Sequence, residues 1–86
     1  MRKPIEHGDP LTERQSVVFD FVRFSIFQGV PPTLKEIAEQ CYPKMKIISA
    51  RGAARLCLQY IERKGYLVVG HNETRGITLT SRGRDL

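Results

Sequence analysis

Three polar side chains, Arg51, Arg55 and Gln59, recur at intervals of four residues in the second half of the chain. In a helix this spacing places them on one face, because a turn takes 3.6 residues. Guanidinium and amide groups donate hydrogen bonds to phosphates and base edges, and arginine suits the two acceptors that guanine exposes in the major groove. The stripe therefore suggests a surface for a nucleic acid, provided that the rest of the chain forms a scaffold that presents it.

The net charge of the chain points to the same kind of partner. The 86 residues include 14 Lys and Arg against 9 Asp and Glu, so the net charge is +5. Residues 1–40 carry a net charge of −1 and residues 41–86 carry +6. The excess lies in the half that holds the stripe, as phosphate binding requires, although a solvated basic surface would have the same composition.

Two capping boxes predict where the first two helices begin. Residues 12–15 and 33–36 both have the pattern Thr-x-x-Gln/Glu. In this pattern each of the two side chains satisfies a backbone N–H group at the helix start. The first helix is expected to end at Gly29 and the second near Cys41, because Pro43 cannot continue a helix.

The stretch 42–49 is the least regular part of the sequence. Ser49 is expected to cap a third helix. Met45, Ile47 and Ile48 are expected to pack under the turn, and the alternative is an exposed apolar patch for a protein partner. The helix itself repeats apolar residues at helical spacing, which predicts a buried face made of Ala53, Leu56, Cys57, Tyr60 and Ile61.

The pattern of apolar residues changes after Gly65. Residues 66–70 and 77–80 have the β-branched or alternating composition of strands, and residues 71–76 have that of a turn. We expect a two-stranded antiparallel hairpin, followed by a short basic tail over residues 81–86 that forms at most one helical turn.

Three helices followed by a hairpin make the α+β arrangement of a winged helix-turn-helix. We assign it to residues 11–80, preceded by a flexible N-terminal arm over residues 1–10. In this fold the third helix enters the major groove of double-stranded DNA. The hairpin acts as a wing that reaches the flanking backbone or the minor groove.

The candidate DNA-binding residues come from the start of the second helix, the following turn, the third helix and the wing. Arg55 is the leading candidate for reading a base, and Arg51 contacts a base or a phosphate. Gly52 either lets the backbone approach a phosphate closely or is merely tolerated beside the helix start. The full set is Thr33, Lys44, Lys46, Ser49, Ala50, Arg51, Gly52, Arg55, Gln59, Asn72, Thr74 and Arg75.

Six short motifs occur in the same order as in a known family. They are Leu11-Thr12-x-Arg14-Gln15, Val18-Phe19-Asp20, Pro31-Pro32-Thr33, Glu36-Ile37-Ala38, Arg63-Lys64-Gly65 and Arg75-Gly76-Ile77. Together they resemble the N-terminal DNA-binding domain of the LexA repressors over about residues 11–80. The resemblance implies sequence-specific binding to double-stranded DNA, with the third helix reading an operator half-site and the wing gripping its flank.

The sequence departs from that family in three ways. Eleven residues separate Ala38 from Ala50, more than the family has. The family reads with small polar and acidic residues, whereas this chain has Arg55 and Leu56 at the matching places, so we expect a different operator. The family also has a second domain that dimerises and cleaves itself with a Ser–Lys pair, and this sequence ends at Leu86 without one. A natural small regulator, as in a phage or mobile element, and a fragment both remain open.

Other classes of protein find little support. His7 and His71 belong to no triad or metal pattern, so we predict no catalytic residue, no metal site and no cofactor. Cys41 and Cys57 form no Cys-x-x-Cys pair and are expected to be reduced core residues. The sequence has no apolar run for a membrane span and no secretory signal, which favours a cytoplasmic protein without a membrane partner.

Two interpretations of the whole chain remain. The first is a transcriptional regulator, most simply a repressor, that binds as a weak or DNA-dependent homodimer. The second is a protein-interaction module on the same scaffold, such as an antirepressor or an inhibitor of a transcription component, with residues 42–49 as its surface. RNA binding is disfavoured because the hairpin lacks a pair of exposed aromatic residues.

Overall fold

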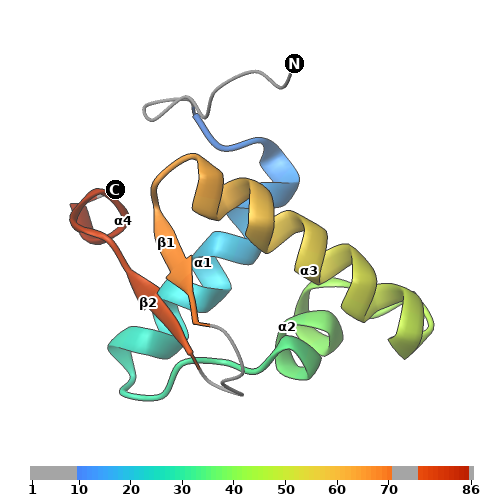
Figure 1. Cartoon of the computed structure of the whole chain (residues 1–86). Helices are drawn as coiled ribbons and strands as arrows, with labels where there is room; N and C mark the ends of the chain where they lie inside the picture. Colours follow the sequence, from blue (N-terminus) through green and yellow to red (C-terminus); the bar gives the residue numbers. More distant parts are fainter. Residues whose placement is uncertain (1–9, 71–75, 86) are drawn as a thin grey trace.

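Three helices precede a two-stranded antiparallel sheet, and a short fourth helix follows it (Figure 1). The computed structural model describes residues 10–70 and 76–85. The order confirms the α+β winged helix-turn-helix. The elements are α1 Glu13–Phe27, α2 Leu34–Cys41, α3 Ile47–Arg63, β1 Leu67–Val69, β2 Ile77–Leu79 and α4 Ser81–Asp85.

Both expected capping boxes are present. At the start of α1 the Thr12 Oγ1 accepts from the Gln15 N–H at 3.2 Å, and Gln15 Oε1 accepts from the Thr12 N–H at 3.1 Å. Thr33 and Glu36 do the same for α2 at 3.1 Å and 2.9 Å. Each cap stabilises its helix by about 1 kcal/mol. Gly29 follows α1 with a φ of 105°, a left-handed conformation that glycine adopts without strain.

The core lies where α1, α2, α3 and the sheet meet. Phe19 of α1 and Tyr66, which precedes β1, are both buried, and their ring centroids lie 5.6 Å apart in a tilted arrangement. Aromatic pairs at this distance add to the stabilisation that burial provides. The buried cluster consists of Val18, Phe19, Val22, Ile37, Cys41, Ala54, Cys57, Leu58, Ile61, Tyr66, Leu67, Ile77 and Leu79.

The sheet pairs Leu67 with Leu79 and places Val68 opposite Thr78. Because side chains alternate along a strand, the two leucines face the core, while Val68 and Thr78 are exposed on the other side. The Gly70 N–H donates to the Gly76 carbonyl at 2.9 Å and closes the described part of the hairpin.

The start of the third helix differs from the expectation. The helix begins at Ile47 with Lys46 as its N-cap residue, and the Lys46 side chain makes no capping hydrogen bond. Ser49 is exposed in the first turn and is not the cap. The Met45 N–H donates to the Tyr42 carbonyl at 3.1 Å and closes a turn before α3. This turn redirects the chain before Ile47, so α3 can begin ahead of the position that a Ser49 cap would give.

Two expectations about burial near this helix are wrong. Met45, Ile47 and Ile48 do not pack under the turn, since all three are exposed. Leu56 and Tyr60 are also exposed, and the buried face is rotated toward Ala50, Ala54, Cys57, Leu58 and Ile61. Small alanines on this face let α3 pack closely on the core, with Leu58 and Ile61 buried beside them and Leu56 and Tyr60 pointing outward.

The tail forms α4, which packs beside Tyr66. The Thr80 hydroxyl donates to the Gly65 carbonyl at 2.5 Å and accepts from the Gly83 N–H at 3.1 Å. Gly83 is buried, and a Cβ atom there would collide with the Tyr66 carbonyl oxygen. Close backbone approach therefore requires glycine at this position.

Candidate nucleic-acid interface

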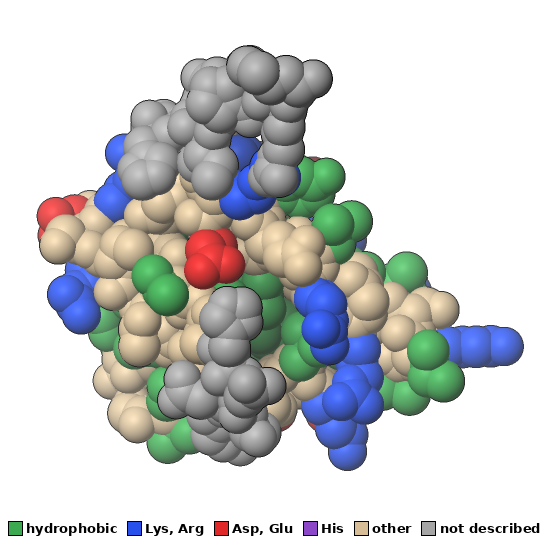
Figure 2. Space-filling model, viewed as in Figure 1, with side chains coloured by type: hydrophobic (Ala, Val, Ile, Leu, Met, Phe, Trp, Pro, Cys, Tyr) green, Lys and Arg blue, Asp and Glu red, His purple; other side chains and the backbone are tan. Residues whose placement is uncertain are grey.

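A groove of about 840 Å³ separates the start of α2 from α3 and the base of the hairpin. Figure 2 shows Lys and Arg side chains gathered around the N-terminal half of α3, with hydrophobic side chains among them. The polar and glycine residues that line the groove are Thr33, Lys35, Arg51, Arg55, Gln59, Glu62, Gly70 and Gly76.

The groove brings together the stripe predicted from the sequence. Arg51, Arg55 and Gln59 are all exposed and all line it. Their positions follow from the packing of α3, because Ala54 and Leu58 are buried one helical position before Arg55 and Gln59. The core therefore holds the backbone of α3 while leaving its guanidinium groups in solvent.

Glu62 fixes the hairpin against α3. Its Oε2 accepts a hydrogen bond from the Val69 N–H at 3.2 Å. The carboxylate lies at the far end of α3 from Arg51, so the basic character of the groove is concentrated toward the N-terminal half of the helix. This contact gives the base of the wing a defined position relative to the stripe.

Two residues at the start of α2 join the groove. Thr33 is half-buried, and its hydroxyl oxygen already accepts the capping hydrogen bond from Glu36. Lys35 is exposed beside it and was missed in the sequence. The sequence did contain a feature that could have identified Lys35. It follows the Thr33 cap by two residues, in the first turn of the helix before α3.

The other candidates divide into three groups. Lys44, Lys46 and Ser49 are exposed around the start of α3. Ala50 is only 1% exposed, so its side chain contributes to the core and not to a contact with DNA. Gly52 is exposed, and a Cβ atom there would meet none of the described atoms within 4 Å. The wing candidates Asn72, Thr74 and Arg75 lie outside the described residues.

Comparison of the sequence with known protein families identifies the family of this chain. The family model of the LexA DNA-binding domain matches residues 8–76. The chain belongs to the LexA DNA-binding domain family. It is a winged helix-turn-helix of the LexA type, and double-stranded DNA is the partner that this membership assigns to it.

Curated LexA repressors are similar to this chain over most of its length. The LexA repressor of Myxococcus xanthus is 39% identical over 77 residues, covering 88% of this chain and 32% of the relative. LexA repressor 1 of Geobacter sulfurreducens is 41% identical over 73 residues, covering 84% and 34%. The chain thus spans about a third of the length of the curated relatives it matches.

The LexA-type scaffold buries both of its cysteines here. Cys41 of α2 and Cys57 of α3 are unpaired thiols in the core, as expected. Burial raises the pKa of both thiols above their ordinary value, and nearby Arg14 partly offsets this. Arg14 donates to the Cys41 carbonyl at 2.9 Å and stacks over the Tyr42 ring.

Among residues 10–70 and 76–85, no three His, Cys, Asp or Glu side chains form a group that could hold a metal ion. Within the same ranges, no helix is long and apolar enough to span a bilayer.

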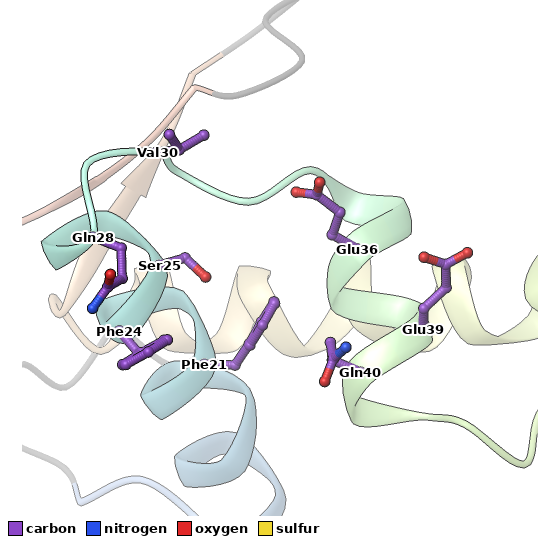
Figure 3. A pocket seen from close by; sticks show the side chains of 8 residues that line it. All are labelled: Phe21, Phe24, Ser25, Gln28, Val30, Glu36, Glu39 and Gln40. Carbon is purple, nitrogen blue, oxygen red and sulfur yellow. The ribbon is translucent and has the colours of Figure 1, made fainter.

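A second hollow lies between the end of α1 and the outer side of α2. Figure 3 shows Phe21 extending from α1 toward α2, whose Glu36, Glu39 and Gln40 form the opposite wall. Phe24 lines the same hollow and is 62% exposed. None of its lining residues belongs to the α3 groove, so the two hollows lie on different surfaces of the molecule.

Proposed function

We propose that this chain is a sequence-specific, double-stranded DNA-binding repressor of transcription, with residues 11–80 as the DNA-binding unit. The observation that carries the proposal is the groove in which Arg51, Arg55 and Gln59 line α3 beside the base of a hairpin. Family membership supports the same function. An α-helix with polar side chains on its outer face fits the major groove, where each base pair presents a distinct pattern of donors and acceptors.

Within this proposal the residues have separate roles. Arg55 donates to the two acceptors of guanine, and Arg51 contacts a neighbouring base or phosphate. Lys35, Lys44 and Lys46 neutralise phosphates beside the reading helix. Gly52 lets the helix backbone approach the DNA. The polar wing residues, Asn72, Thr74 and Arg75, contact the flanking backbone or the minor groove.

The chain acts by binding DNA and not by catalysis. It requires no metal or cofactor, and its work lies in the compartment that holds the DNA, the cytoplasm of a bacterial cell. Helix-turn-helix proteins commonly read two half-sites about one helical turn apart, so we infer a weak or DNA-dependent homodimer on a palindromic site.

The decisive experiment is selection of random duplex DNA by the purified chain, followed by titration of the best duplex at two salt concentrations. We expect an enriched motif and a steep fall in affinity with salt, because each neutralised phosphate releases counterions. Binding without any motif would contradict sequence-specific reading. A motif without symmetry would contradict the homodimer and leave specific binding intact.

A protein-interaction module remains the second candidate because Met45, Ile47 and Ile48 are exposed at the start of α3. Exposed apolar clusters of this kind are typical of protein contacts. The two functions differ in their response to salt. Absence of DNA binding at low salt would favour the protein partner and make residues 42–49 the first surface to mutate.

A further inference from the structure

Ile48 is the most exposed large apolar side chain among the described residues, at 84%. It lies in the first turn of α3, which begins three residues earlier than a Ser49 cap would allow. A β-branched residue in an exposed helical position gains nothing from packing and loses side-chain freedom against the preceding turn. Neither helix propensity nor the core therefore explains isoleucine at this position.

The helical spacing places Ile48 on the reading face. Gly52 follows it by four residues and Arg55 by seven, and these intervals bring side chains to the same side of a helix. Arg55 lines the groove, and Gly52 is exposed without a side chain of its own. This side of α3 therefore carries, in order, the aliphatic side chain of Ile48, no side chain at Gly52 and the guanidinium group of Arg55.

The charges around Ile48 indicate the chemistry of what it meets. Residues 44–55 include four basic residues, Lys44, Lys46, Arg51 and Arg55, and no acidic residue. The three basic residues nearest to Ile48 in sequence are exposed. An aliphatic side chain with cations on both sides suits the DNA major groove, where the thymine methyl group is apolar and the walls are phosphates.

We propose that Ile48 is a specificity-determining residue that contacts the 5-methyl group of a thymine. This inference rests on the proposed function of the α3 groove. Seven residues of helix rise about 10 Å from Ile48 to Arg55, which corresponds to roughly three base-pair steps of 3.4 Å. The thymine is therefore expected about three steps from the guanine read by Arg55.

The test uses the duplex obtained by selection with the 86-residue chain. Each thymine in turn is replaced by uracil, which removes only the methyl group and keeps the base pairing. We expect one substitution to weaken binding by about fourfold, the equivalent of about 0.8 kcal/mol for one buried methyl group. The Ile48→Ala variant should bind thymine and uracil duplexes equally and keep the preference for guanine.

Val17→Ala is the matched control, because Val17 is an aliphatic residue of α1 that is 46% exposed and absent from the groove. It should retain the methyl discrimination of the unmodified chain. Thermal unfolding checks that both variants fold, as expected for substitutions at exposed positions.

Three results would overturn the inference. The selected site could contain no thymine near the guanine, uracil could bind as well as thymine at every position, or Ile48→Ala could keep the methyl discrimination. In each case a selected motif would leave the proposed function standing. If the chain selects no motif, the proposed function and this inference fail together.

Discussion

The α3 surface and the α1–α2 surface of this small domain are built differently. The first exposes Arg51 and Arg55 along a groove that reaches the hairpin. The second exposes Phe24 beside a hollow whose other wall includes Glu36 and Glu39. Phosphates are attracted to the cations of the first surface and repelled by the carboxylates of the second, so this difference favours binding of DNA at the α3 surface.

The contrast extends to the helices themselves. α3 buries apolar side chains such as Ala54 and exposes Arg55 and Gln59, together with apolar side chains such as Leu56. α1 buries Phe19 but leaves Phe24 and Phe27 exposed on other sides. Both helices therefore expose apolar residues, and the difference is that α3 adds arginines along the groove, whereas α1 adds aromatic residues beside the second hollow.

The largest effect should come from Arg55→Ala, which removes the central cation of the α3 groove. We expect the affinity for the selected duplex to fall roughly 5- to 150-fold, with the preference at one guanine relaxed. Arg84→Ala is the charge-matched control, since Arg84 is exposed on α4 and does not line the groove. An equal loss for all sequences would reduce Arg55 to a phosphate contact.

Gly52→Ala should separate the stability of α3 from its function. A Cβ atom at Gly52 meets nothing within 4 Å of it among the described atoms, and alanine favours a helix over glycine by about 1 kcal/mol. We therefore expect the denaturation midpoint to rise while DNA affinity falls severalfold, because the added methyl group keeps the helix away from the DNA. Unchanged affinity would mean that Gly52 is merely tolerated.

Alkaline pH should lower the stability of the core, which contains Cys41 of α2 and Cys57 of α3. Burial raises the pKa of the Cys57 and Cys41 thiols above the ordinary 9.0. A raised folded-state pKa leaves stability intact below the unfolded pKa, and the contribution is lost as pH rises through the folded value. We expect the free energy of unfolding to decline above about pH 9.

Denaturant titrations from neutral pH to about pH 10 measure this decline. The Cys57→Ala variant should show a shallower pH dependence, whatever its stability at neutral pH. An identical pH dependence in both proteins would mean that ionisation of this thiol is not linked to unfolding.

Phe24→Ser should have the smallest effect. Phe24 is 62% exposed, so the free energy of unfolding is expected to change by less than about 0.5 kcal/mol. DNA affinity should also stay the same, because the residue lies away from the α3 groove. A loss of DNA affinity in a binding titration would show that the two surfaces are not independent.

Local sequence patterns were enough to predict most of the elements. The caps at Thr12 and Thr33 are local hydrogen-bonding patterns within four residues, and Pro43 is incompatible with a continued helix. For these reasons the limits of α1 and α2 could be predicted closely. The start of α3 could not, because the helix begins at Ile47 and its N-cap residue, Lys46, makes no side-chain capping hydrogen bond. The nearest residue of capping type, Ser49, misled the prediction.

The candidate site was only partly predictable. The spacing of Arg51, Arg55 and Gln59 placed them on one face, and the structure adds Lys35 and the base of the hairpin to the same groove. Ala50 was proposed as a contact residue but is buried. Helical periodicity predicted one apolar face for α3 that included Leu56 and Tyr60, and the packed structure exposes both and buries Ala54 and Leu58 instead.

The sequence by itself determined the order of the elements, the two capped helices, the hairpin and the basic second half, because these depend on short-range hydrogen bonds, backbone restrictions and composition. Only the tertiary structure decided the rotation of α3 and thus the exposure of Ile48, Leu56 and Tyr60. That rotation depends on how closely α2 and the hairpin pack against Ala54 and Leu58, and residues far apart in sequence determine it together.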